Sequence, residues 1–106
     1  MKPIPTIPAA LLLLSLTSPP VFAEGAGIEW DILNQEVMEL HRAGKYDRAV
    51  VVAQKALEVA ENSVGADHPD VATSLNNLAG LYRATERTEE AEKLERRAER
   101  IRAMER

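Results

Sequence analysis

The sequence predicts an all-α fold built from two tandem helix-turn-helix hairpins. After residue 23 the chain contains a single proline, Pro69. This scarcity of proline favours long helices. Apolar residues recur at spacings of three and four, the period of a helix with one buried face. The chain also repeats itself at an offset of 42 residues, with these matches: Leu33-Asn34 on Leu75-Asn76, Leu40 on Tyr82, His41 on Arg83, Lys45 on Arg87, Asp47 on Glu89, Ala49 on Ala91, Val52 on Leu94, Lys55 on Arg97, Ala56 on Ala98 and Val59 on Ile101.

Residues 1–23 have the composition of a signal peptide. They hold five of the six prolines and one charged side chain, Lys2, followed by an apolar run over residues 9–16. The small residue Ala23 ends a sequence that a signal peptidase accepts, so we expect cleavage after Ala23 and a periplasmic or secreted product. The alternative is a retained membrane anchor. The apolar run is about half of the roughly 20 residues that a spanning helix needs, so we expect no stable membrane insertion after cleavage.

Cleavage would leave 83 residues, divided into a short linker (24–27), a first repeat (28–66) and a second repeat with a charged C-terminal helix (67–106). These residues carry 12 basic and 17 acidic side chains, a balance that argues against nucleic acid as a partner, because such binding needs a basic face. Residues 24–70 have a net charge of −6 and residues 71–106 a net charge of +1. This polarity would orient two copies head to tail or attract a basic partner segment to the first repeat.

The first repeat is expected to contain two helices. Gly44 supplies the left-handed residue that ends the first helix, and Asp47 places a carboxylate in the first turn of the second. The second helix should end near Glu61-Asn62. The expected buried stripes are Ile28, Ile32 or Leu33, Val37 and Leu40 in the first helix, and Ala49, Val52 or Ala53, Ala56, and Val59 or Ala60 in the second.

The second repeat is expected to follow a loop over residues 62–67. Pro69 suits the first turn of its first helix, with Asp67 or His68 as the capping residue. The last helix has the spacing of a short coiled-coil seam as well, but we favour a solvated helix, because it is shorter than three heptads. The expected buried stripes are Val71, Leu75, Leu78, Ala79 and Tyr82, then Ala91, Leu94, Ala98 and Ile101.

These positions together resemble the tetratricopeptide repeat. The residues that carry the resemblance are Leu33, Val37, Leu40, Gly44, Tyr46, Ala49 and Ala56 in the first unit, and Leu75, Leu78-Ala79, Tyr82, Ala91 and Ala98 in the second. The stretches 65–72, 74–79 and 81–84 and the period of 42, longer than the common 34, resemble the kinesin-light-chain-like subtype. The resemblance implies a short right-handed α-solenoid.

The second unit departs from the first at three places. Glu86 stands at the position of Gly44, Thr88 at that of Tyr46, and Glu95 where the family usually has an aromatic residue. A final repeat with a polar outer face is what a terminal, capping repeat needs, and simple degeneration of the repeat is the other interpretation.

The resemblance also implies a binding groove lined by the first helix of each hairpin. Gly80 replaces Met38 on this face and leaves space, asparagine amides can bond a peptide backbone, and Arg42 with Arg83 could hold a carboxylate. The alternative is that these side chains are only solvated or cap loops. The candidate partner-binding residues are Asn34, Met38, His41, Arg42, Asn76, Asn77 and Arg83.

No enzymatic constellation is assembled in the sequence. His41 and His68 belong to different elements, and His68 with Asp67 and Asp70 fits helix capping better than metal binding. We therefore expect no catalytic residue, cofactor or metal, and a protein or peptide partner. The function expected is an exported adaptor, and the alternative is a membrane-tethered structural or assembly subunit. Two repeats form a small core, which predicts self-association or folding on a partner.

Overall fold

The computed structural model describes residues 25–105, which form four helices and no strand. In chain order they are α2 (Ile28–Arg42), α3 (Tyr46–Val64), α4 (Pro69–Ala84) and α5 (Thr88–Met104). This confirms the predicted all-α fold class. The predicted signal peptide and cleavage site, residue 24 of the predicted linker and Arg106 lie outside the described residues. None of the described helices has the length and hydropathy required to cross a bilayer.

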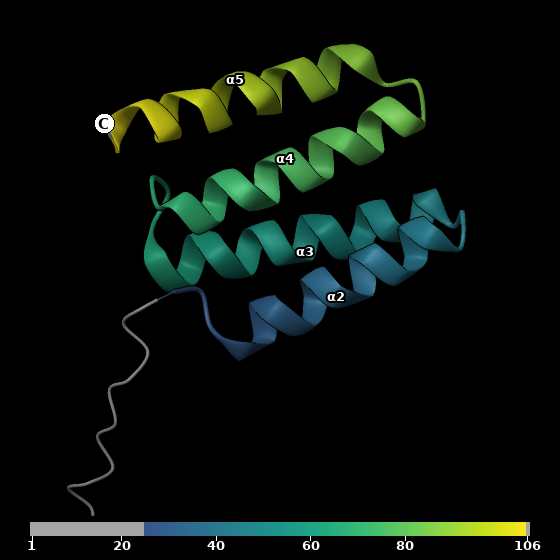
Figure 1. The fold of residues 1–106 in the computed structure, drawn as a ribbon, viewed down its shortest axis with the longest axis horizontal. Helices are drawn as coiled ribbons and strands as arrows, with labels where there is room; N and C mark the ends of the chain where they lie inside the picture. The colour runs from purple at the N-terminus through teal and green to yellow at the C-terminus, as the bar shows by residue number, and fades with distance from the viewer. Residues whose placement is uncertain (1–24, 106) are drawn as a thin grey trace, which may run out of the picture.

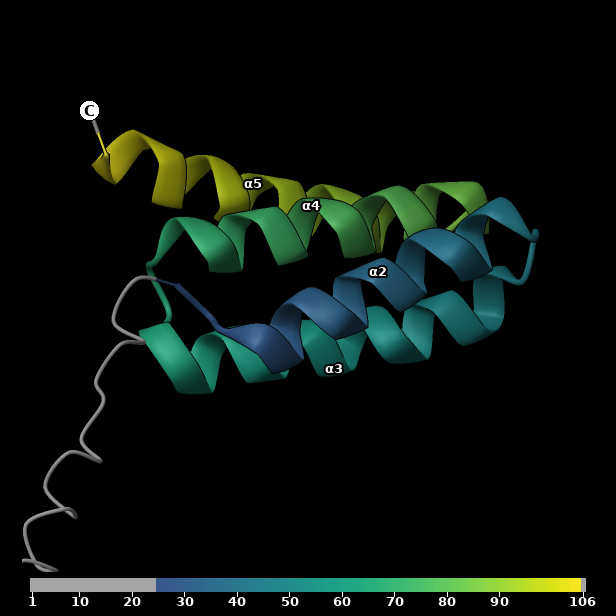
Figure 2. The ribbon, with the colours of Figure 1, turned by 60° about the horizontal axis from the view of Figure 1, so that its bottom comes forward.

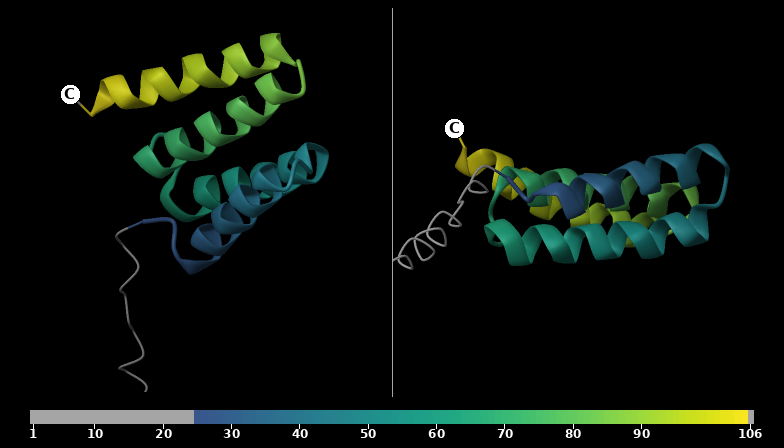
Figure 3. Two further views of the ribbon diagram at one scale, coloured as in Figure 1. Left: turned by 45° about the vertical axis from the view of Figure 1, so that its right-hand side comes forward. Right: turned by 90° about the horizontal axis from the view of Figure 1, so that it is seen from below.

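The four helices form two successive antiparallel hairpins. Helix α2 packs on α3, α3 on α4, and α4 on α5, so the second hairpin continues the row begun by the first (Figure 1). Figure 2 brings α2 to the front, where it lies over α3, and the left view of Figure 3 shows the same order of the four helices as Figure 1. Because each hairpin contacts its neighbour through α3 and α4, these two helices form the junction between the repeats.

Both hairpin turns use the same hydrogen-bonded ending. The Lys45 N–H donates to the Leu40 carbonyl at 2.9 Å, and the equivalent Arg87 N–H donates to the Tyr82 carbonyl at 2.7 Å. This ending requires a left-handed residue after the helix. Gly44 has φ 77° as predicted, whereas Glu86 adopts φ 65° with a side chain that disfavours it.

The connection between the hairpins is shorter than the sequence predicts. Helix α3 does not end near Glu61-Asn62 but runs to Val64, because half-buried Val64 packs against the core cluster under α4. Gly65, with φ 93°, then ends it. Pro69 opens α4 as predicted, and the Nδ1 atom of His68 caps the helix by accepting a hydrogen bond from the Asp70 N–H at 3.0 Å.

The core is built mainly from alanine, leucine and valine. The predicted stripe of α4 is wholly buried, and alanines at the α3 and α5 contacts have essentially no exposed surface, which lets the helix backbones approach closely. Half-buried residues such as Leu57 and Leu94 join the two clusters into one core. The buried apolar residues of α3 and α5 are Ala49, Val50, Ala53, Ala56, Ala60, Ala91, Ala98 and Ile101.

The predicted buried stripe of α2 is wrong at its start. Val37 is buried, but Ile28 is 77% exposed. Of the two alternatives at the next position, Ile32 is 58% exposed and Leu33 is half-buried. The positions 42 residues later, Asp70 and Ser74, are covered by Ala26 and Trp30 of the first repeat. Among the described residues no helix precedes α2, so nothing covers the corresponding face of α2.

Charged residues occupy the two outer edges of the row. At the junction between the repeats, α3 contributes Val50 and Leu57, and α4 contributes buried apolar side chains. The residues at the same repeat positions on the outer edges are exposed glutamates: Glu92 and Glu99 of α5 for Val50 and Leu57, and Glu29, Glu36 and Glu39 of α2 for Val71, Leu78 and Leu81. The α5 edge therefore has the polar character of a capped end, which supports the capping interpretation of the second repeat, whereas the α2 edge combines its glutamates with the exposed Ile28 and Ile32.

Candidate functional site

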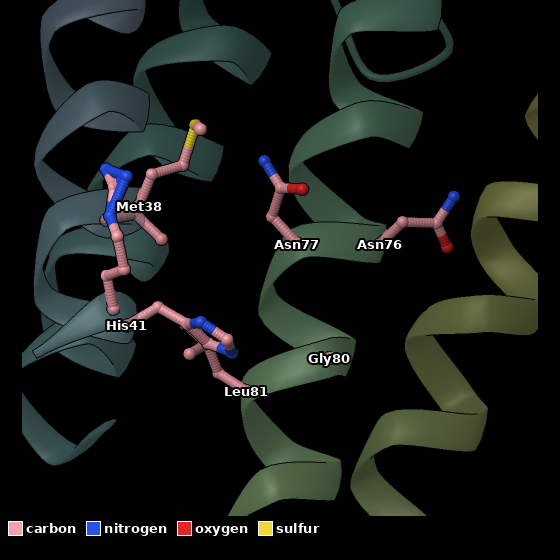
Figure 4. Close-up of a pocket in the computed structure, with 8 residues that line it drawn as sticks. Met38, His41, Asn76, Asn77, Gly80 and Leu81 are labelled. Carbon is pink, nitrogen blue, oxygen red and sulfur yellow. The ribbon is translucent and has the colours of Figure 1, made fainter. Parts of the chain in front are cut away.

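A pocket of about 410 Å³ lies between α2 and α4 (Figure 4). Helix α2 supplies one wall and α4 the other, so one wall comes from each repeat. We call it the α2–α4 pocket, and its lining residues are Val37, Met38, His41, Arg42, Asn76, Asn77, Gly80 and Leu81.

Five of the seven predicted binding residues line this pocket, namely Met38, His41, Arg42, Asn76 and Asn77. The other two, Asn34 and Arg83, are not among its lining residues. Asn34 is half-buried one turn earlier on α2, and Arg83 lies one turn later on α4. The structure thus places the central residues of the predicted groove around one pocket, whereas Asn34 and Arg83 lie outside that pocket.

Arg83 is held by a carboxylate of the chain itself. Its Nε and Nη2 atoms donate to both carboxylate oxygens of Glu95 on α5, at 2.8 and 2.7 Å. This hydrogen bonding raises the pKa of Arg83 and lowers the pKa of Glu95. Arg83 therefore binds a carboxylate, as predicted, but this carboxylate belongs to Glu95 of the same hairpin and not to a bound ligand.

The base of the α2–α4 pocket is apolar. Val37 and Leu81 are buried below it, and Met38 is 59% exposed beside it. A Cβ atom added at Gly80 would meet nothing within 4 Å, so the glycine leaves open space in the α4 wall. Figure 4 shows Met38 of α2 at the level of Asn77, with Gly80 one turn further along α4. The result is a recess beside Gly80.

The polar end of the pocket contains His41 and Arg42, at the C-terminal end of α2. The His41 ring stands edge-on to the Tyr46 ring, with centroids 5.3 Å apart and planes at 68°, which fixes its orientation. The sequence predicted Tyr46 only as a position of the repeat pattern, not as a neighbour of the pocket. It also missed Leu81 as a pocket residue, although its position directly after Gly80 was an available signal.

Polar contacts between the repeats set the distance between the two walls. The Trp30 Nε1 atom donates to the Ser74 Oγ atom at 2.7 Å, and the Ala26 N–H donates to Asp70 Oδ2 at 2.9 Å. Both contacts join the start of the first repeat to α4. On the other side, Gln54 of α3 donates to the Tyr82 hydroxyl at 3.0 Å. Because α4 is held from both sides, the pocket is preformed.

The arrangement is suited to noncovalent recognition. Within residues 25–105 no group of three or more histidine and carboxylate side chains is placed to hold a metal ion. His68 serves as the cap of α4, and His41 faces the pocket without a neighbouring nucleophile among its lining residues. The lining offers amides, one imidazole, one guanidinium and apolar surface, which together can bind a polypeptide segment.

Comparison with known proteins supports the repeat assignment. The family model described as Tetratricopeptide repeat matches residues 37–104. Nephrocystin-3 of Xenopus laevis is 40% identical and nephrocystin-3 of Mus musculus 49% identical, each over 55 residues. These alignments cover 52% of this chain and 4% of each relative, so the chain spans only a small part of the length of these curated relatives. Because the family model covers more than half of its residues, the chain belongs to the tetratricopeptide repeat family.

Proposed function

We propose that the chain is an exported, non-enzymatic adaptor that binds a polypeptide segment in the α2–α4 pocket. The observation that carries the proposal is the convergence of five predicted binding residues from two repeats on one preformed pocket. Tetratricopeptide repeats generally mediate protein–protein interaction, which agrees with this use of the pocket. The 42-residue period supports assignment to the kinesin-light-chain-like subtype.

The pocket is tested by site-specific crosslinking. A photoreactive residue at Met38, which lines the pocket, should capture a partner from the cell envelope, and mass spectrometry should identify the same partner peptide in repeated experiments. The same residue at Lys93, exposed on α5, is the matched control. Gly80→Leu, which fills the recess, should abolish capture at position 38. Equal capture from both positions, or capture that persists with Gly80→Leu, would contradict the proposal.

Export rests on the composition of residues 1–23. Mass spectrometry of the protein recovered from the envelope gives the direct test. An N-terminus at Glu24 supports the exported adaptor. An intact Met1 supports the alternative, a membrane-tethered structural or assembly subunit that retains its leader as an anchor.

Self-association follows from the small size of the core and stays a prediction. Glutamates at the junction-equivalent positions of α2 and α5 disfavour the head-to-tail stacking that the charge polarity of the two repeats would favour, so a pair of copies would use another face. Sedimentation equilibrium at micromolar concentration measures the state. A folded monomer that unfolds cooperatively would contradict the prediction of self-association.

A further inference from the structure

The α2 edge, at the opposite end of the row from α5 (Figure 1), combines exposed apolar and acidic side chains. Ile28 and Ile32 are four residues apart and therefore lie on the same side of the helix, 77% and 58% exposed. Of the five large apolar residues exposed within residues 25–105, three belong to α2. The residues of the α2 edge are Ile28, Glu29, Ile32, Glu36 and Glu39, and none of them lines the α2–α4 pocket.

The carboxylates of the α2 edge have no cation of this chain paired with them. Elsewhere Glu61, Glu90 and Glu95 each pair with an arginine. No ion pair is recorded within residues 25–105 for the three glutamates of the α2 edge. Residues 28–39 hold four acidic and no basic side chains, because the basic residues of α2 lie in its last turn. The α2 edge is therefore complementary to a positively charged surface.

The junction between the repeats shows how a helix packs on this face. The α4 residues 42 positions after Glu36 and Glu39 are leucines, and both are buried in one cluster with α3. Helix α3 contributes Val50 and Leu57 to this cluster, seven residues apart. Because glutamates replace the two leucines on α2, a helix placed there in the same way needs lysine or arginine where α3 has valine and leucine.

We propose that the α2 edge docks a basic amphipathic helix of a partner protein. Apolar side chains of this helix cover Ile28 and Ile32, and its lysine or arginine side chains pair with the glutamates. Helix α2 has 15 residues and is about 22 Å long, so the docked helix has about four turns. A second copy does not fit this description, since its α5 edge presents Glu92 and Glu99.

This docking surface goes beyond the proposed function and does not depend on it, because the α2 edge and the pocket share no residue. A partner bound at the α2 edge leaves the pocket open. The surface also gives a place to the basic partner segment that the net charge of −6 over residues 24–70 predicts.

A phage-displayed library of helical peptides tests the occupant, with the whole chain as bait. The wild-type protein should enrich helices that have an apolar stripe beside lysine or arginine at seven-residue spacing. Ile28→Ser/Ile32→Ser should abolish the enrichment, and Glu36→Gln/Glu39→Gln should remove the basic preference. The matched control, Glu89→Gln/Glu92→Gln, removes the same charge from exposed positions of α5 and should leave the motif unchanged.

Synthetic peptides of the enriched motif give the magnitude by titration calorimetry, with circular dichroism to confirm that each variant is folded. We expect Glu36→Gln/Glu39→Gln to weaken binding about fivefold, as for two exposed ion pairs, with affinity that falls as salt rises. Ile28→Ser/Ile32→Ser should weaken binding about tenfold or more, because apolar burial is lost. Gly80→Leu should change nothing, which separates this surface from the pocket.

The outcomes that would overturn the proposal are specific. They are no enrichment, enriched helices without basic residues, enrichment that survives Ile28→Ser/Ile32→Ser, and binding that Gly80→Leu removes. A photoreactive residue at Ile32 that captures only a second copy of the chain would overturn it as well. Loss of capture at Met38 with an unchanged motif at the α2 edge would contradict only the proposed function.

Discussion

The indole of Trp30 donates a hydrogen bond of 2.7 Å to the hydroxyl of Ser74, a serine with 1% of its surface exposed in the middle of α4. The contact satisfies a buried polar group with the single tryptophan of the chain. It also joins the first helix of one repeat to the first helix of the next. These two helices are the walls of the α2–α4 pocket, so the bond contributes to the spacing on which the proposed recognition depends.

Trp30→Phe should lower the free energy of unfolding by about 1–2 kcal/mol, because it leaves the Ser74 hydroxyl buried without its donor. Ser74→Ala should cost less, since half-buried Trp30 can reach water. The double variant should be more stable than the sum of the two losses implies. Urea unfolding followed by circular dichroism measures all three. Strictly additive losses would show that the bond contributes nothing.

The two hairpin turns give a paired test of backbone strain. Glu86→Gly should raise the free energy of unfolding by about 0.5–1 kcal/mol, because glycine adopts φ 65° without a Cβ penalty. Gly44→Ala at the equivalent turn should lower it by about 1 kcal/mol. Thermal unfolding of both variants gives the comparison, and a destabilised Glu86→Gly protein would contradict the account.

Stability in acid should depend on two carboxylates. Hydrogen bonds from Arg87 and Arg83 lower the pKa of Glu90 and of Glu95 below the ordinary value of 4.5. A carboxyl whose pKa is lowered by folding stabilises the fold above its unfolded pKa, and this contribution is lost as pH falls through its folded pKa. The wild-type melting temperature should therefore fall more steeply below pH 4.5 than that of the Glu90→Gln/Glu95→Gln variant. Parallel curves would refute this coupling.

Stacking of copies should be limited by the charged edges. Replacing Glu92 and Glu99 of α5 by valine and leucine, and Glu29 and Glu36 of α2 by valine and leucine, recreates the side chains of the junction between the repeats. We expect this variant to form larger assemblies in sedimentation velocity, since a head-to-tail contact that does not close propagates. The wild-type protein should form none by this route, and wild-type filaments would contradict the capping role of the edges.

Much of the fold could be predicted because local and repeating signals agree. The 42-residue period, the glycine at position 44 and the proline at position 69 fix the helix order, and the stripe of α4 is buried as expected. The burial of Ile28 could not be predicted correctly, because burial depends on a neighbouring helix and not on period alone. The end of α3 was missed because tertiary packing of Val64 extends the helix beyond its local signals.

The candidate site was only partly predictable for a similar reason. The repeat pattern identifies which face of α2 and α4 lines the groove, and this face contains Met38, His41 and Asn77. It does not reveal that Arg83 pairs with Glu95, because the partner comes from a helix outside the groove. Nor does it show that Asn76 and Asn77 point in different directions. In Figure 4 Asn77 points toward Met38 and Asn76 points toward α5.

The most direct test of the central claim is the affinity of the crosslinked partner segment for the wild-type protein and for Gly80→Leu, measured by titration calorimetry. Leucine has the higher helix propensity by about 1 kcal/mol, so this variant should be at least as stable as the wild type. Since its side chain occupies the recess beside Gly80, we predict binding at least tenfold weaker, about 1.4 kcal/mol. Unchanged affinity in a fully folded Gly80→Leu protein would show that the α2–α4 pocket is not the binding site.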